Sequence, residues 1–131
     1  MIALVDTNLI SELARPRPNA NVVAWLSGLD EIALSAITVD ELFFGAALRP
    51  NPRVERWLDG VLGSISTVLD VTAAIARHAG VLRGQLAARG RARDQGDMLI
   101  AATATIHGIP LATRNIRHFD GCGITVVNPF A

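Results

Sequence analysis

The sequence predicts an α/β fold in which helices cover both faces of a parallel sheet. Short apolar runs alternate along the chain with longer segments in which apolar residues recur at helical spacing. The first run, residues 2–5, is wholly apolar and ends at a carboxylate, which is typical of a buried parallel strand. With 131 residues, half of them apolar, the chain is long enough for one core and too short for two. We therefore expect a single domain over residues 1–131.

The first half of the chain predicts two strands and three helices. The strand at 2–5 leads into a helix at about 7–14, which Pro16 stops. A second helix, at about 21–29, has apolar residues on one face, and a second strand follows at 32–36. The third helix is expected to open at Thr38 and to run to about residue 48. Glu41 stands three residues after Thr38, as in a capping box.

The second half continues the alternation. Pro52 suits the first turn of a fourth helix over 52–62, and a short strand follows at 67–69. Thr72 and Gly90 are the expected boundaries of a fifth helix. A sixth helix begins near residue 95, is apolar almost all round and ends at Gly108, so it should be buried. The last two strands are expected at 111–113 and 124–127.

Composition and charge limit the classes of function and the cell compartments that are compatible with the chain. The formal net charge is zero, so any nucleic acid must be held by a local basic patch rather than by the whole surface. The single cysteine excludes an internal disulfide and suits a reducing compartment. The first residues lack the pattern of a signal peptide, and no apolar run is long enough to span a membrane. We therefore expect a cytoplasmic protein.

Three carboxylates stand where strands or loops pass into helices: Asp6, Glu41 and Asp97. Each has a structural alternative. Asp6 suits the N-cap of the helix that follows, Glu41 completes the capping box with Thr38, and Asp97 follows Asp94 at the same spacing. In a parallel sheet, however, the junctions that follow the strands meet at one edge. All three acids are therefore expected to lie together.

Such a cluster favours a divalent metal. Carboxylates within about 6 Å of one another raise each other's pKa unless a cation joins them. Mg²⁺ or Mn²⁺ prefers oxygen ligands of this kind, and a bound ion activates water and stabilises charge on a phosphoryl group. The residues alone therefore favour hydrolysis of a phosphodiester.

Four segments carry a family resemblance. Residues 4–13 read LVDTNLISEL, 37–45 read ITVDELFFG, 96–104 read GDMLIAATA and 111–115 read LATRN. In this order and at these separations they resemble a PIN domain, and in particular the VapC toxins of bacterial toxin–antitoxin pairs. The closing NPF, residues 128–130, is similar too. The resemblance covers essentially the whole length.

The resemblance implies a five-stranded parallel sheet with helices on both faces, and a Mg²⁺- or Mn²⁺-dependent endoribonuclease. Its acidic positions match Asp6, Glu41 and Asp97. We expect Asp6 and Asp97 to coordinate the metal directly, and Glu41 to complete the site or to orient the attacking water as a base. The family often has another acid within the stretch matching residues 115–118, which here reads NIRH. Asn115 is the candidate to replace it as a neutral ligand, with Asp94 and Asp120 as alternative sources of charge.

Residues near the three acids are candidates to support the metal site or to bind RNA. Thr7, Asn8 and Thr113 are candidates to hold a carboxylate or a metal-bound water, although helix-start hydrogen bonding is the alternative for Thr7 and Asn8. His118 is the one histidine expected near the site. The local basic patch that holds RNA is expected among six arginines: Arg15, Arg17, Arg91, Arg93, Arg114 and Arg117.

The family also implies a homodimer and a cognate VapB-type antitoxin that lies across a groove near the first two helices. In this chain that region would include Leu9, Leu13, Trp25 and Leu26, for which core packing is the alternative. One rival function is a degenerate PIN domain that binds RNA or a partner without cutting it. A phospho-accepting signalling domain is excluded, because it relies on a lysine and this chain has none.

Overall fold

The computed structural model describes residues 1–64 and 66–131. Its centre is a five-stranded sheet in the order β3-β2-β1-β4-β5, with every neighbouring pair parallel. The strands are β1 (Ile2–Val5), β2 (Glu31–Ser35), β3 (Ser66–Leu69), β4 (Leu111–Ala112) and β5 (Val126–Val127). The predicted fold is therefore confirmed, and the first strand along the chain is the central one.

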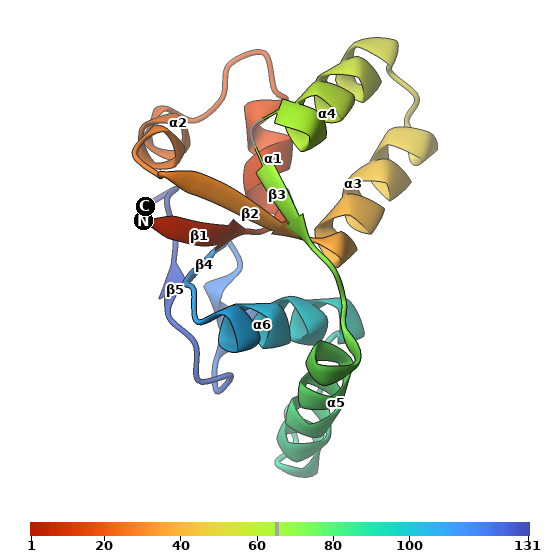
Figure 1. Ribbon diagram of the computed structural model, residues 1–131, viewed down its shortest axis with the longest axis vertical. Helices are drawn as coiled ribbons and strands as arrows, with labels where there is room; N and C mark the ends of the chain where they lie inside the picture. The colour runs from red at the N-terminus through yellow and green to blue at the C-terminus, as the bar shows by residue number, and fades with distance from the viewer. Residues whose placement is uncertain (65) are drawn as a thin grey trace.

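Helices cover the sheet from both sides (Figure 1). Helices α1, α2 and α4 lie on one face, and α5 and α6 lie on the other. The helices are α1 (Thr7–Leu13), α2 (Ala20–Ser27), α3 (Ala36–Leu48), α4 (Pro52–Ser64), α5 (Ala73–Ala88) and α6 (Gln95–His107), with a short 3-10 helix η1 (Ile116–Phe119). None of the helices in the described part of the chain has the length and apolarity needed to cross a bilayer.

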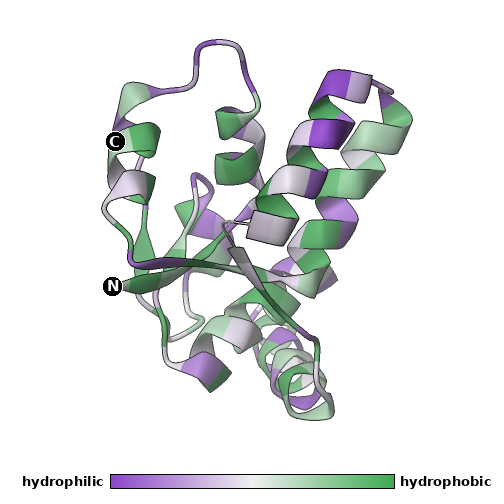
Figure 2. Ribbon diagram, turned by 45° about the horizontal axis from the view of Figure 1, so that its top comes forward, coloured by the Kyte–Doolittle hydropathy of each residue, from purple (hydrophilic) through white to green (hydrophobic). Residues whose placement is uncertain are grey.

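The pleat of the sheet divides the core in two. Leu4 pairs with Ala33 and Leu111, and all three pack with α5 and α6. The next residues along, Val5 and Ala112, pack instead with α1 and α2. Because successive side chains of a strand point to opposite faces, a wholly apolar strand is required here. In Figure 2 the strand at the N-terminus is accordingly hydrophobic, while the outer helices carry both colours.

Helix α3 begins earlier than predicted. Ser35 is its N-cap, and the Ser35 hydroxyl accepts a hydrogen bond from the Ile37 N–H at 3.0 Å. The predicted capping box is therefore wrong: Thr38 is fully buried inside the helix, and Glu41 lies in the second turn rather than the first. Serine and threonine are both favoured N-caps, so Ser35 and Thr38 are both suitable as the N-cap of α3 when only the sequence is considered.

Both ends of α6 follow the prediction. Asp94 is its N-cap and accepts a hydrogen bond from the Asp97 N–H at 3.0 Å. Gly108 closes the helix in the left-handed conformation with a φ of 64°, which a residue with a side chain rarely adopts. Between these ends the helix is buried from Ile100 to Ala104. The cap at the start of α6 fixes the position of Asp97.

The two isoleucines of α6 provide a test of this packing. Ile100 is fully buried and Ile106 is 48% exposed. We expect Ile100→Ala to lower the free energy of unfolding by about 2–5 kcal/mol, because the change leaves a cavity. Ile106→Ala should cost less than about 1 kcal/mol. Urea denaturation measures both, and equal losses would contradict the buried position of α6.

Candidate functional site

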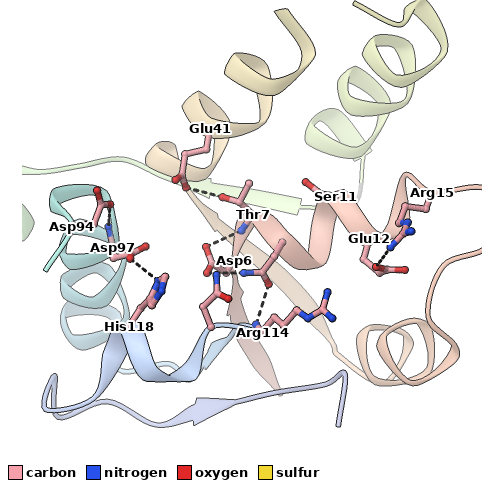
Figure 3. Close-up of a pocket in the computed structure, with 12 residues that line it drawn as sticks. Asp6, Thr7, Ser11, Glu12, Arg15, Glu41, Asp94, Asp97, Arg114 and His118 are labelled. Carbon is pink, nitrogen blue, oxygen red and sulfur yellow. Dashed lines mark hydrogen bonds and ion pairs between the residues drawn. The ribbon is translucent and has the colours of Figure 1, made fainter. Parts of the chain in front are cut away.

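The candidate site lies beyond the carboxyl ends of the central strands. Asp6 follows β1 and Thr113 follows the neighbouring β4, so the two residues meet at one edge of the sheet. Helix α3 brings Glu41 and the first turn of α6 brings Asp97. Together they line a cavity of about 880 Å³, shown in Figure 3. Its lining is Asp6, Thr7, Asn8, Ser11, Glu12, Arg15, Glu41, Asp94, Asp97, Arg114, Asn115 and His118.

Asp6 is the most firmly held of these carboxylates. It is only 5% exposed. One oxygen, Oδ1, accepts a hydrogen bond from the Thr7 N–H at 2.8 Å. The other, Oδ2, accepts hydrogen bonds from the Thr113 hydroxyl at 2.8 Å and from the Asn8 amide at 3.3 Å. Asp6 thus caps α1 and remains in the cavity wall, so its structural and functional interpretations are compatible.

Glu41 lies across the cavity from Asp6. Its Oε1 accepts a hydrogen bond from the Thr7 hydroxyl at 2.7 Å. Burial raises the pKa of Glu41 above its usual value, although the Thr7 hydrogen bond lowers it, and the charges of Asp6, Asp97 and Asp94 raise it further. Glu41 is therefore a carboxylate short of positive charge, which is the condition that a bound cation relieves.

Asp97 is held by the neighbouring loop. Its Oδ2 lies 3.1 Å from Nδ1 of His118, which belongs to η1. Burial raises the pKa of Asp97, with further contributions from the charges of Asp6 and Asp94, while His118 lowers it. Within residues 1–64 and 66–131, His118 is the one basic side chain in ion-pair range of Asp6, Glu41, Asp94 or Asp97.

The structure brings most of the predicted site residues together. All three principal acids line the cavity, and so do the supporting residues Thr7, Asn8 and Asn115; Thr113 is fully buried behind Asp6. Asp94 lines it as well, whereas Asp120 does not. Of the six arginines, Arg15 and Arg114 line this cavity and Arg93 lines a smaller one beside it. Arg17, Arg91 and Arg117 line neither.

Sequence reasoning missed two residues of the cavity, Ser11 and Glu12. Glu12 is 8% exposed and accepts hydrogen bonds from the Asn19 N–H at 2.9 Å and from Arg15 at 3.3 Å. The signal was available, because Ser11 and Glu12 stand three and four residues after Asn8, which places them on the same face of α1 as Asn8. That face is the one that follows Asp6.

The donor chemistry of the site fits a hard divalent cation. The acids offer carboxylate oxygens, which Mg²⁺ and Mn²⁺ prefer, and the pKa values of Glu41 and Asp97 are raised first by burial and then by the neighbouring carboxylates. In the described part of the chain, no three His, Cys, Asp or Glu side chains are already gathered as a ready-made metal site. Carboxylates without a cation repel one another, so wider separation is expected.

Comparison with known proteins identifies the family. The model of the PIN-domain family matches residues 3–121. The chain belongs to the PIN-domain family. Its relatives include the toxin FitB of Neisseria gonorrhoeae, 37% identical over 97% of both chains. The VapC ribonuclease Y4jK of Sinorhizobium fredii is 36% identical over 97% of this chain and 96% of its own.

A solved structure agrees with the fold over its full length. VapBC-1 from nontypeable Haemophilus influenzae aligns with a TM-score of 0.86 and 28% identity, covering 100% of both chains. The family resemblance that the four segments indicated is confirmed by these comparisons.

Two glutamates at this site permit a test of its electrostatics. An acid whose pKa is raised on folding stabilises the fold at low pH, and that contribution is lost as the pH rises through the raised value. Glu41 is such an acid. In EDTA at pH 7, Glu41→Gln should therefore raise the Tm by about 2–4 °C, and the gain should shrink as the pH falls.

Glu12→Gln is the matched control. Glu12 is paired with Arg15, so the same substitution removes a stabilising partner and should lower the Tm. Thermal denaturation followed by circular dichroism measures both changes. A lower Tm for Glu41→Gln would show that Glu41 is not short of positive charge.

Proposed function

We propose that this protein is a metal-dependent endoribonuclease that acts as the toxin of a VapBC-type toxin–antitoxin pair in the cytoplasm. The observation that carries the proposal is the convergence of Asp6, Glu41 and Asp97 on one cavity without a lysine or arginine paired to them in the described residues. The names of the relatives, a toxin and a VapC ribonuclease, support the same activity. Residues 1–131 then form one nuclease domain.

Asp6 and Asp97 are the proposed ligands of Mg²⁺ or Mn²⁺, and Glu41 completes the site or serves as a base. When bound, the ion lowers the pKa of water and stabilises negative charge on the phosphoryl group. Both oxygens of Asp6 are held, Oδ1 by the Thr7 N–H and Oδ2 by the Thr113 hydroxyl, so the orientation of this carboxylate is already fixed. Asp94 is the proposed source of additional charge, because it lines the cavity and Asp120 does not.

The chain's own groups handle the substrate and the proton. Glu41 is the proposed acceptor of the proton that the attacking water gives up. Attack on phosphorus breaks the bond to the 3′ oxygen, which leaves as a hydroxyl, and the phosphate stays on the 5′ carbon of the next nucleotide. Thr7 orients Glu41 through its hydroxyl. Asn115 faces the same cavity and is the proposed holder of the water.

A cognate VapB-type antitoxin and a second copy of this chain are the proposed protein partners. An apolar groove of about 370 Å³ lies beside the site, between α1, α3 and α4. It is lined by Ala14, Pro16, Leu42, Ala46, Val54 and Leu58 among others. Of the residues expected at such a contact, Leu9 and Leu26 are buried in the core, so the packing alternative is correct for them. Leu13 and Trp25 are partly buried against the same core.

Replacing the proposed ligands tests the activity. Asp6→Asn and Asp97→Asn should each reduce Mn²⁺-dependent cleavage of RNA by at least about 100-fold, because each removes a charged ligand. Asp59→Asn, at an exposed position of α4, is the control and should cleave normally. Near-normal cleavage by both ligand variants, each shown to be folded, would overturn the scheme. A wild type that binds RNA but does not cut it with Mn²⁺ would favour the degenerate binding module.

Metal binding should depend on pH in a defined direction. Protons compete with the metal for Glu41 and Asp97, whose pKa values are raised, so affinity should fall as the pH is lowered and do so at a higher pH than for ordinary carboxylates. The rise in Tm on adding Mn²⁺, compared with EDTA, measures this affinity. An equal rise at pH 5 and at pH 8 would contradict the assignment of these acids to the metal.

A further inference from the structure

The cavity is unfavourable for a polyanion over most of its surface. Five carboxylates line it, those of Asp6, Glu12, Glu41, Asp94 and Asp97, against the two arginines Arg15 and Arg114. The remaining basic residue of the lining, His118, contacts Asp97. A metal ion at the acids compensates part of this charge at the bond that is cut. The phosphates on either side of that bond still need a positive group of the protein, because the backbone of RNA carries one negative charge per nucleotide.

The two arginines differ in their availability. Arg15 is paired with Glu12 at 3.3 Å, so its charge is largely compensated. Arg114 has no carboxylate within ion-pair distance in the described part of the chain, and it is exposed. In Figure 3 it reaches from the β4 side of the cavity toward Glu12 and Arg15. Arg114 therefore supplies the uncompensated arginine charge of the cavity wall.

The Arg114 side chain is held at its outer end by an aromatic ring. Its guanidinium carbon lies 4.8 Å from the centroid of the Phe130 ring, within the range of a cation–π contact. A guanidinium stacked on a ring keeps the N–H groups at its edge free for a phosphate. Phe130 is itself fixed, since its N–H donates to the Asn128 side chain at 3.0 Å and its ring packs against the core beside α1 and α2.

The backbone of Arg114 is held by the catalytic residues' own network. Its N–H donates to Oδ1 of Asn8 at 3.0 Å, and the Asn8 amide donates to Asp6 at 3.3 Å. The preceding residue, Thr113, donates its hydroxyl to the same aspartate. Arg114 is thus placed at a fixed separation from Asp6, which is the arrangement that a subsite for a neighbouring phosphate requires.

We propose that Arg114 binds an RNA backbone phosphate next to the one that is cleaved, and that Phe130 is the positioning residue that holds the guanidinium for it. This inference rests on the proposed ribonuclease function. A phosphate contact of this kind aligns the strand and does not read the bases, so it should act on RNA of any sequence. The proposal singles out Arg114 from the six arginines that the sequence indicated as candidates for RNA binding.

The test measures the binding of a fluorescein-labelled single-stranded RNA by anisotropy, in EDTA and over a series of salt concentrations. Arg114→Gln should weaken binding by about 5–10-fold and reduce the slope of log K against log salt by about 0.7, the value for one phosphate contact on a single strand. Arg89→Gln, an exposed arginine at the end of α5, is the matched control and should change neither.

The role of Phe130 requires its own variants. Phe130→Leu should weaken RNA binding by about 2–4-fold, whereas Phe130→Tyr, which keeps the ring, should bind like the wild type. In an Arg114→Gln background, Phe130→Leu should cause no further loss, because its effect acts through the arginine. With Mn²⁺ and cleavable RNA, the loss in Arg114→Gln should fall on KM rather than on kcat.

Several results would overturn the inference: equal RNA affinity and salt slope in the Arg114 and Arg89 variants, equal loss in both Phe130 variants, or additive losses in the double variant. Equal affinity is also the result expected if Arg114 serves an acidic protein segment instead of RNA. A different result would contradict the proposed function while leaving the phosphate contact intact. A wild type that binds RNA through Arg114 but never cleaves it would contradict the nuclease and support the phosphate contact.

Discussion

The position of β1 at the centre of the sheet determines the rest of the site. Its parallel neighbours β2 and β4 end at the same edge, so the residues that follow all three strands come together there. Asp6 begins the first helix, Ser35 caps the third, and Thr113 follows β4 and bonds to Asp6 at 2.8 Å. This bond joins residues 107 positions apart in the chain. A shift of the β1–β4 register by one residue would separate them and turn the side chains of β4 to the wrong face.

The acids at this edge are unfavourable for folding, because their charges are partly buried and close to one another, but the proposed metal site needs them. Glu41 and Asp97 have raised pKa values because burial and neighbouring carboxylates disfavour their charge. By contrast, Glu12 lies in the same cavity with an arginine and a backbone N–H as partners. Among the described residues Glu41 has no basic partner and Asp97 has only His118, so the proposed cation would compensate charge at these two acids.

Local patterns in the sequence predicted the parallel sheet, the helices on both faces and the acids at one edge. The Asp94 cap and Gly108 were predictable because each depends on a few neighbouring residues. The start of α3 was not, because Ser35 and Thr38 both suit a cap and only the end of β2 decides between them. The contacts of His118 with Asp97 and of Phe130 with Arg114 depend on how separate segments fold back, which periodicity does not report.

Helix α3 stands between two cavities. Glu41, together with Ser11 and Arg15 of the facing segment, lines both the acidic cavity and the apolar groove beside it. A molecule bound in the groove would therefore touch Glu41, which is a proposed ligand of the cation. Thermodynamic linkage makes such an influence reciprocal: whatever factor the groove's occupant imposes on cation affinity, the cation imposes on the occupant. An occupant of this groove that favours one position of Glu41 would then change the affinity for the cation without covering Asp6 or Asp97.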